Sequence, residues 1–281
     1  MNERSRPPEP SARPPQRVAI AGLGTIGLKV ARALDRGIDG LALVAVAGRE
    51  PGKTAAQAAT LACRPDVLDS DALADAADLV LDCAPSAAFA ALAASVVDAG
   101  KVLITVNAGA LLRHLDLVER AKATGGRIIV PTGGLLGLDA VRAAAEGRIE
   151  RVTMITRKPP NGLEGAPYLV ERGISLAGLN APRRVFEGNA ADGAKGFPAN
   201  VNVAAALGLA GIGPQQTRLE IWADPALDRN THTIEVEADS ARFTLRIENV
   251  PSAENPRTGK ITALSVIACL RGLTSPLRVG T

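Results

Sequence analysis

Two histidines, His114 and His232, occur in the 281 residues, and imidazole is the side chain that titrates nearest neutral pH. His114 sits in a polar run and is expected at the surface. His232 follows Ala223-Asp-Pro225 and Arg229-Asn-Thr231, where a loop enters a strand. Alone it could simply cap that loop. The context that favours a chemical role for His232 comes from three other segments, residues 157–160, 197–205 and 254–258.

A glycine pattern near the start of the chain points to a second kind of chemistry. Gly22, Gly24 and Gly27 have Gly-x-Gly-x-x-Gly spacing and enclose Thr25 and Ile26. Such glycines permit a tight turn, close approach of the backbone to a pyrophosphate, and close packing of helix on strand. The turn follows an apolar strand and opens a helix, which disfavours a purely structural role. These five residues are predicted to bind NAD or NADP.

The end of the second predicted strand bears on which cofactor is used. An acidic residue normally holds the adenosine ribose there, but this chain has Ala47-Gly-Arg-Glu50. No carboxylate occupies the strand end, and Arg49 is placed to meet a 2′-phosphate. The pattern favours NADP, or use of both cofactors, over strict NAD preference. The alternative is that Arg49 is a solvated loop cation.

The first part of the chain must position this turn. Apolar strands alternate with helices from residue 17 to 131, which predicts a parallel sheet covered on both faces. We therefore expect a Rossmann doubly wound domain over residues 17–132, preceded by a disordered tail, 1–16, rich in proline and arginine. The predicted strands are 18–21, 41–46, 78–83, 101–105 and 127–130, and the predicted helices are 26–34, 87–97 and 111–123.

After residue 139 the hydrophobic pattern changes. Polar and apolar residues alternate in 232–237 and 243–248, which is typical of antiparallel strands with one solvated face. Strands are also predicted at 152–157, 217–222 and 241–247, and helices at 200–209 and 258–273. The fold class is thus α/β, with a second α+β domain (133–257) that carries a mostly antiparallel sheet. The C-terminal helix (258–281) is expected to pack back on the first domain, and the active site to lie between the domains.

Composition excludes several other classes of protein. The formal net charge is +3 and aromatic residues are 2%, so neither charge nor stacking platforms favour a nucleic-acid partner. No apolar run is long enough to span a bilayer, and the N-terminus lacks a secretory h-region. The three cysteines have no metal-site spacing. We expect a cytoplasmic protein with no metal and no membrane or nucleic-acid partner.

Five segments, in order, resemble the L-aspartate dehydrogenase family. The resemblance covers essentially everything after the tail. The segments are Pro131-Thr-Gly-Gly-Leu-Leu-Gly-Leu-Asp139, Arg157-Lys-Pro-Pro160, Phe197-Pro-Ala-Asn-Val-Asn-Val-Ala-Ala205, Ala223-Asp-Pro225 with Asn230-Thr-His232, and Asn255-Pro-Arg-Thr-Gly259.

The resemblance implies oxidation of L-aspartate to iminoaspartate, then oxaloacetate and ammonia, by a homodimer that supplies NAD biosynthesis. It places the family's active-site histidine at His232 and a cofactor-contacting asparagine at Asn202. A cofactor-contacting alanine falls at Gly134, so that contact is through backbone. Gly134, Arg257 and Gly259 depart from the family's Ala, Lys and Ser. The last two departures put the substrate's identity in question more than the chemistry.

His232 could exchange protons with the substrate amine or the hydrolytic water, or hold a substrate carboxylate as a cation. Arg157, Lys158 and Arg257 are candidates to bind the carboxylates of a dicarboxylic amino acid; each could instead be an ordinary solvated charge. Asn200 suits a helix cap better than Asn202 does.

Two other functions stay open at this point. One is a reductase or dehydrogenase of a related amino acid, imine or semialdehyde, since dihydrodipicolinate reductase and homoserine dehydrogenase share the two-domain plan. The other is a non-catalytic NAD(P)-binding sensor. His232 and Asn202 argue against the sensor, because sensing a cofactor needs no proton-transfer group.

Overall fold

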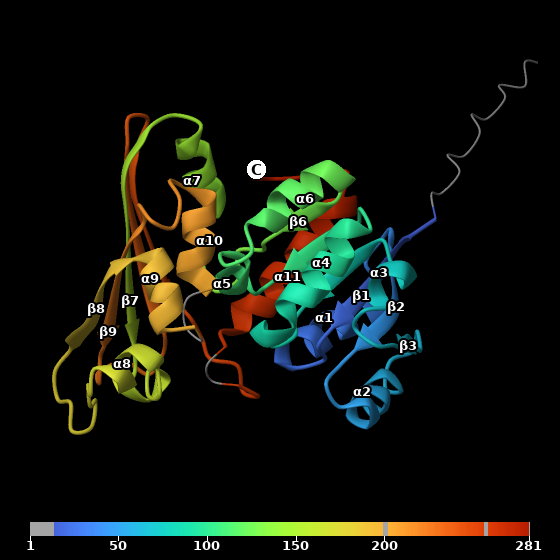
Figure 1. The fold of residues 1–281 in the computed structure, drawn as a ribbon, viewed down its shortest axis with the longest axis horizontal. Helices are drawn as coiled ribbons and strands as arrows, with labels where there is room; N and C mark the ends of the chain where they lie inside the picture. Colours follow the sequence, from blue (N-terminus) through green and yellow to red (C-terminus); the bar gives the residue numbers. More distant parts are fainter. Residues whose placement is uncertain (1–13, 199–201, 256–257, 281) are drawn as a thin grey trace, which may run out of the picture.

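A computed structural model describes residues 14–198, 202–255 and 258–280, which form two lobes, each built on one sheet (Figure 1). The first sheet has six strands, all parallel, in the order β3-β2-β1-β4-β5-β6. This is the strand order of a dinucleotide-binding doubly wound fold, so the predicted sheet is confirmed. Its strands are β1 (Gln16–Ala21), β2 (Leu41–Ala47), β3 (Asp66–Val67), β4 (Leu79–Asp82), β5 (Val102–Thr105) and β6 (Arg127–Ile129).

Helices cover both faces of this sheet because its central strands are apolar on both faces. In β1, Val18 and Ile20 belong to one buried cluster, while Ala19 and Ala21 belong to another, as the alternation of a strand requires. The helices are α1 (Thr25–Asp35), α2 (Pro51–Ala58), α3 (Leu73–Ala76), α4 (Phe89–Asp98), α5 (Ala108–Leu111) and α6 (Asp116–Thr124), with a short 3₁₀ helix, η1 (Ser86–Ala88).

The last helix of the chain belongs to this first lobe. In α11 (Lys260–Thr274), Val266 and Leu270 are buried in the same cluster as Val30 and Leu34 of α1. The Thr274 hydroxyl donates to the Asp39 carbonyl oxygen at 2.7 Å. α11 therefore completes the helical layer that α1 begins.

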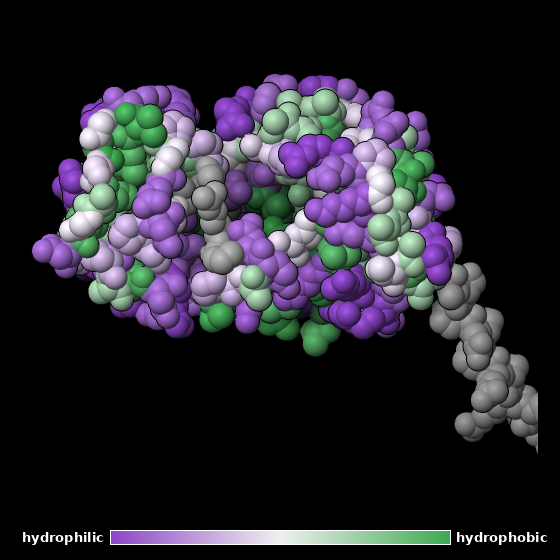
Figure 2. All heavy atoms as spheres, turned by 90° about the horizontal axis from the view of Figure 1, so that it is seen from below, coloured by the Kyte–Doolittle hydropathy of each residue, from purple (hydrophilic) through white to green (hydrophobic). Residues whose placement is uncertain are grey.

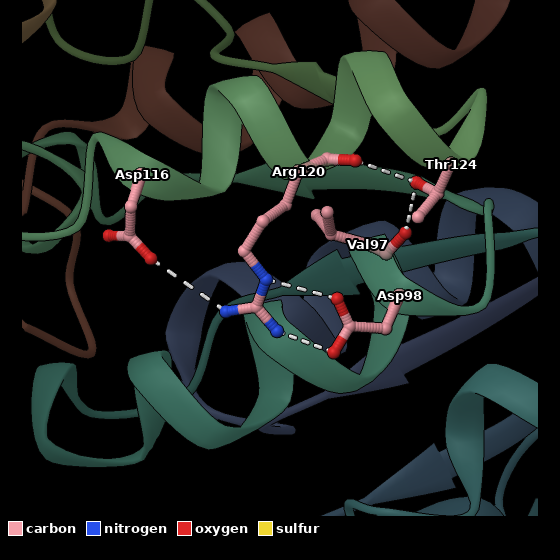
Figure 3. Close-up of polar contacts among 5 residues, drawn as sticks. All are labelled: Val97, Asp98, Asp116, Arg120 and Thr124. Atoms are coloured by element: carbon pink, nitrogen blue, oxygen red, sulfur yellow. Dashed lines mark hydrogen bonds and ion pairs between the residues drawn. The ribbon is translucent and has the colours of Figure 1, made fainter.

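Polar contacts on the outer surface fasten α6 to α4 (Figure 3). The Arg120 guanidinium forms two hydrogen bonds with the Asp98 carboxylate and lies 3.7 Å from Asp116. The Thr124 hydroxyl donates to the Val97 carbonyl oxygen at 2.6 Å. None of these residues lines the cavities described below, and the network holds α6 against α4.

The second lobe is a five-stranded sheet in the order β11-β10-β7-β9-β8, antiparallel except for the parallel pair β7–β9. This confirms the mostly antiparallel sheet. Helices α7, α9 and α10 lie on the face toward the first lobe (Figure 1). The elements are α7 (Leu138–Ala145), β7 (Ile149–Lys158), the 3₁₀ helix η2 (Pro160–Gly162), α8 (Pro167–Glu171), β8 (Arg183–Asn189), α9 (Ala190–Gly196), α10 (Asn202–Ala210), β9 (Arg218–Ala223), β10 (Thr231–Ala238) and β11 (Arg242–Glu248).

The predicted tail falls mostly on residues 1–13, outside the described residues, and Gln16 already belongs to β1. Within the described ranges, no helix is long and apolar enough to cross a membrane. In the same ranges, no three His, Cys, Asp or Glu side chains are grouped so that they could hold a metal ion.

Candidate active site between the two lobes

The turn after β1 has the geometry that a dinucleotide requires. Gly22 has a φ of +91°, and a Cβ there would lie 2.6 Å from the Cys83 carbonyl oxygen. A Cβ on Gly27 would lie 1.9 Å from the Gly22 carbonyl oxygen, so α1 packs this closely only because Gly27 has no side chain. A Cβ on Gly24 would meet no atom within 4 Å. The space in front of α1 is therefore open.

The N-terminus of α1 faces that open space. Gly24 is the N-cap, no side chain caps the helix, and its first turn holds no acidic residue. The first N–H groups of a helix have no intrahelical partner and carry partial positive charge. A pyrophosphate is the ligand that such an end favours. The residues present, including Thr25 and Ile26 in the first turn, fit a nicotinamide dinucleotide.

A buried carboxylate, not noted in the sequence analysis, fixes the neighbouring strand ends. Asp82, at the end of β4, accepts hydrogen bonds from the Thr105 hydroxyl at 2.7 Å, the Asn107 side-chain amide at 2.9 Å and the Ala84 N–H at 3.1 Å. Burial raises the pKa of Asp82, and these bonds oppose that rise. Because Cys83 contacts the glycine turn, the network holds the strand end on which the turn packs. The feature of the sequence that could have identified Asp82 is an aspartate at the end of an apolar strand.

Arg49 lies in the turn between β2 and α2, just beyond the strand end. Its side chain is 82% exposed, and its guanidinium is 3.7 Å from the Glu50 carboxylate. Gly48 packs against Thr54, whose hydroxyl oxygen would lie 2.2 Å from a Cβ at Gly48. The exposure of Arg49 fits both a phosphate-binding cation and a solvated loop cation.

A cavity lies between the two lobes, and Figure 2 shows the molecule hollowed there. The first lobe contributes Ile26 from α1 and the loop at 131–134 after β6. The second lobe contributes Lys158, Asn202 and His232. The fold thus brings three residues from β7, α10 and β10 to the open end of the glycine turn.

β10 places His232 on the inner face of the second sheet. Its partner in the β7 register is Thr156, and the two side chains are 4% and 2% exposed. The Thr156 hydroxyl lies 3.1 Å from the imidazole Nδ1. Burial, and secondarily the Lys158 cation, lowers the pKa of His232 to about 3. In the free protein the imidazole is therefore neutral near pH 7, the form that can accept a proton, and not a cation.

Lys158 lies two residues beyond Thr156 on β7, so its side chain is on the same inner face. It is 5% exposed, and burial lowers its pKa to about 8. Lys158 and Asn230 line this cavity and also an adjoining one, which Asn161 and Arg229 line as well. A buried ammonium thus separates the space near His232 from a second polar space.

Arg157 points the other way, because adjacent residues of a strand face opposite sides of the sheet. Its guanidinium is 3.3 Å from the Asp224 carboxylate and 5.1 Å from the centre of the Trp222 ring, and it lines neither cavity. The structure does not bring it together with His232. Arg257 and Asn200 lie outside the described residues.

Two of the predicted cofactor contacts are tied to other residues. The Gly109 N–H in α5 donates to Asn202 Oδ1 at 3.0 Å, so this oxygen links the lobes and Nδ2 is the atom left for a ligand. The Gly134 carbonyl oxygen accepts from Asn249 Nδ2 at 2.9 Å. A Cβ at Gly134 would lie 3.5 Å from Val203, an ordinary contact, so alanine would also fit here.

Two family models match consecutive parts of the chain, and the second match includes α11, which packs on the first lobe. Residues 22–131 match the NAD-binding domain of homoserine dehydrogenase. Residues 139–273 match the C-terminal domain of aspartate dehydrogenase. The boundary between the matches falls in the loop that lines the cavity.

Solved structures show the same fold. An aspartate dehydrogenase from Thermotoga maritima, 23% identical, has a TM-score of 0.71 and covers 94% of this chain and 99% of its own. A homoserine dehydrogenase from Thiobacillus denitrificans, 16% identical, has a TM-score of 0.60 and covers 92% of this chain and 73% of its own.

Relatives at higher identity span both lobes. An L-aspartate dehydrogenase of Bradyrhizobium diazoefficiens is 57% identical over 94% of each chain. L-aspartate dehydrogenase 3 of Bordetella bronchiseptica is 52% identical over 94% of this chain and 97% of its own. An L-aspartate dehydrogenase of Methanosarcina acetivorans is 39% identical over 94% of this chain and 99% of its own. The glycine turn, the two-lobed fold and these similarities agree: the chain belongs to the L-aspartate dehydrogenase family.

Proposed function

We propose that this protein is an NAD(P)-dependent L-aspartate dehydrogenase. One observation carries the proposal: a buried neutral imidazole, His232, and a buried ammonium, Lys158, line one cavity at the open end of the dinucleotide turn. Oxidising an amino acid needs a proton acceptor for the substrate ammonium, and a carboxylate substrate needs a cation. The relatives, which are L-aspartate dehydrogenases, supply the identity of the amino acid.

The cofactor site would be formed by residues of both lobes. When bound, NAD(P)⁺ supplies the hydride acceptor for the substrate Cα. The N–H groups at the start of α1 hold the pyrophosphate, and Gly24 leaves room for it. Asn202 Nδ2 and the Gly134 backbone lie at the cavity. Arg49 would pair with a 2′-phosphate, so we propose that NADP is accepted as well as NAD.

Lys158 and Arg229 would bind the two carboxylates of aspartate. Lys158 carries its charge below about pH 8 and lies in the wall shared by the two cavities. Arg229 lines the second cavity, with its guanidinium held by Asp228 at 2.7 and 3.0 Å. A dicarboxylate that reaches from one cavity into the other meets a cation at each end. That Arg257 binds a substrate carboxylate stays a prediction. The position of Arg157 argues against such a role for Arg157.

His232 would move the protons. The neutral imidazole accepts a proton from the substrate ammonium and leaves the neutral amine that hydride loss requires. Carboxylates bound at Lys158 offset the repulsion between that cation and the new imidazolium. After this proton passes to solvent, the imidazole takes another from the water that attacks the imine carbon and returns it to the departing ammonia. Thr156, 3.1 Å from Nδ1, orients the ring so that Nε2 serves the substrate.

The test is reduction of NAD⁺ and NADP⁺ with a panel of L-amino acids, with oxaloacetate plus ammonia in reverse. L-aspartate should be the preferred substrate, and His232→Ala should lower kcat at least about a hundredfold. His114→Ala is the matched control, because His114 stacks near Phe89 with ring centres 6.0 Å apart and does not line the cavity. Turnover of another amino or imino acid without aspartate would overturn the substrate. Near-normal turnover in His232→Ala would overturn the role of the histidine.

A further inference from the structure

Asn249 carries a polar atom that neither the sequence analysis nor the proposed chemistry uses. It follows β11, its side chain lines the cavity between the lobes, and it is 5% exposed. Its N–H donates to the Asn230 carbonyl oxygen at 2.8 Å, which fixes the backbone beside the strand that carries His232. The side chain is therefore held in place at the cavity wall.

The orientation of the Asn249 amide follows from its partner. The Gly134 carbonyl oxygen is an acceptor only, so the atom 2.9 Å from it must be the Nδ2 donor. Oδ1 then points elsewhere. It is buried and has no hydrogen-bond partner within the described residues. Thr231 Oγ1 is the other such atom there, and Thr231 does not line the cavity.

A buried acceptor without a donor is uncommon in a folded protein and calls for an explanation, such as a ligand. The neighbours of Asn249 Oδ1 at the cavity wall include two glycines. A Cβ on Gly259 would lie 2.9 Å from Oδ1, and a Cβ on Gly134 would lie 3.8 Å from it. Two residues without side chains thus flank the atom. The missing partner must be a donor, because Oδ1 can only accept.

The donor could belong to the nucleotide or to the substrate, and the position of Asn249 within the cavity bears on which. Lys158 lines both cavities and Arg229 lines the second, where a dicarboxylate would be drawn, whereas Asn249 lines only the first. It shares its own cavity with Ile26 of the dinucleotide turn and contacts the loop after β6 through Gly134. Asn249 thus contacts the loop after β6, on the first lobe's side of a cavity that it shares with Lys158 and His232.

We propose that Asn249 Oδ1 accepts a hydrogen bond from the carboxamide N–H of the nicotinamide ring. The inference rests on the proposed function and extends it, because it assigns the residue that recognises the reacting ring. Asn249 would hold the carboxamide from one side and so set the rotation of the ring relative to the substrate. It would make the protein discriminate against cofactors whose ring substituent lacks an N–H.

The test uses calorimetric dissociation constants rather than turnover. In the 3-acetylpyridine analogue of NAD⁺ a methyl group replaces the carboxamide nitrogen, so no N–H remains. The wild-type protein should bind NAD⁺ at least about tenfold more tightly than the analogue. In Asn249→Ala this ratio should fall to within about twofold of one. An unchanged ratio in that variant would overturn the proposal.

A second variant keeps the test valid if Asn249→Ala does not fold. Gly259 has an ordinary backbone conformation, φ −68° and ψ 141°, so Gly259→Ala acts through the contact of its new Cβ with the Asn249 side chain, 2.9 Å from Oδ1 and 3.2 Å from Cγ. It should lower the same ratio while circular dichroism stays unchanged. Gly272→Ala is the matched control, because a Cβ there meets nothing within 4 Å.

A second set of titrations distinguishes the two possible sources of the N–H donor, which are the nicotinamide carboxamide and the substrate ammonium. Succinate has the two carboxylates of aspartate without the ammonium, and both are titrated into the protein saturated with NADH. If Asn249→Ala changes the aspartate-to-succinate affinity ratio but not the NAD⁺-to-analogue ratio, the donor is the substrate and the proposal is wrong. If the wild-type protein binds no NAD⁺ at all, the proposed function itself fails.

Discussion

Replacing Lys158 by methionine should make the protein more stable and less active. Lys158 is 5% exposed, so folding removes nearly all water from a charged ammonium at neutral pH. Methionine has a similar length and no charge, and it adapts to irregular space. The substitution therefore keeps the packing of β7 and removes the charge that the proposed site needs.

The size of the effect follows from the pKa. Burial lowers it from 10.5 to about 8, and at about 1.4 kcal/mol per unit the buried charge destabilises the fold by up to roughly 3 kcal/mol. Some polar contacts of the ammonium are lost as well, so a gain of about 1–3 kcal/mol is expected. The folded-state pKa is the lower one, so the penalty is complete below about pH 8. It disappears as the pH rises toward 10.5.

Urea unfolding followed by tryptophan fluorescence measures this directly. Trp222 is the single tryptophan of the sequence and lies on β9, which pairs with β7. Lys158→Met should unfold at higher urea than wild type at pH 7, and the difference should shrink at pH 10. The KM for aspartate should rise at least tenfold at pH 7. Lys195→Met is the control, because that side chain is 78% exposed and its loss should change little.

Two results would refute the reasoning. If Lys158→Met is less stable than wild type by the same amount at pH 7 and pH 10, the ammonium stabilises the fold instead of opposing it. If the variant is more stable but binds and turns over aspartate normally, the buried charge does not bind substrate.

Three further predictions follow from the cofactor turn and the histidine. Gly24→Ala should unfold like wild type and lose most of its NADH affinity, because its Cβ meets only open space in the protein. Gly27→Ala should lose thermal stability as well as NADH affinity, because its Cβ would lie 1.9 Å from a carbonyl oxygen. NADH titration and thermal unfolding distinguish the two variants. Equal behaviour of Gly24→Ala and Gly27→Ala in both assays would contradict the geometry. Arg49→Ala should weaken NADP⁺ roughly tenfold relative to NAD⁺, and an unchanged ratio would mark Arg49 as a solvated cation. The pH profile of kcat/KM should show no histidine break near pH 6.5, because burial lowers the pKa of His232 to about 3; a break there would mean that water reaches the imidazole.

The parallel sheet was predictable because its strands are short apolar runs separated by helices. β3 was not, since Asp66 and Val67 are only two residues and both are exposed. β8 was missed because an edge strand has few core positions. In Arg183–Asn189 only Val185 and Phe186 are buried, so its polar pattern resembles a loop.

The residues of the site were named from the sequence, but their arrangement was not accessible there. Arg157 and Lys158 are adjacent, and only the register of β7 with β10 shows that Lys158 shares a face with His232. Asp82 binds Thr105, 23 residues away, and Asn249 binds Gly134, 115 residues away, and no local pattern reveals these partners. The homodimer and the cytoplasmic location stay predictions.

The return of α11 to the first lobe has a consequence for synthesis. The core that Val30 and Leu34 begin is closed by Val266 and Leu270, which are synthesised only after the whole second lobe. The second lobe is complete in sequence before then, with β11 ending at Glu248. The lobe made first should therefore be the last to become resistant to proteases during synthesis. In chains truncated before Lys260, the nucleotide-binding lobe should be the incompletely folded part. Cellular quality control should therefore recognise this lobe rather than the second lobe.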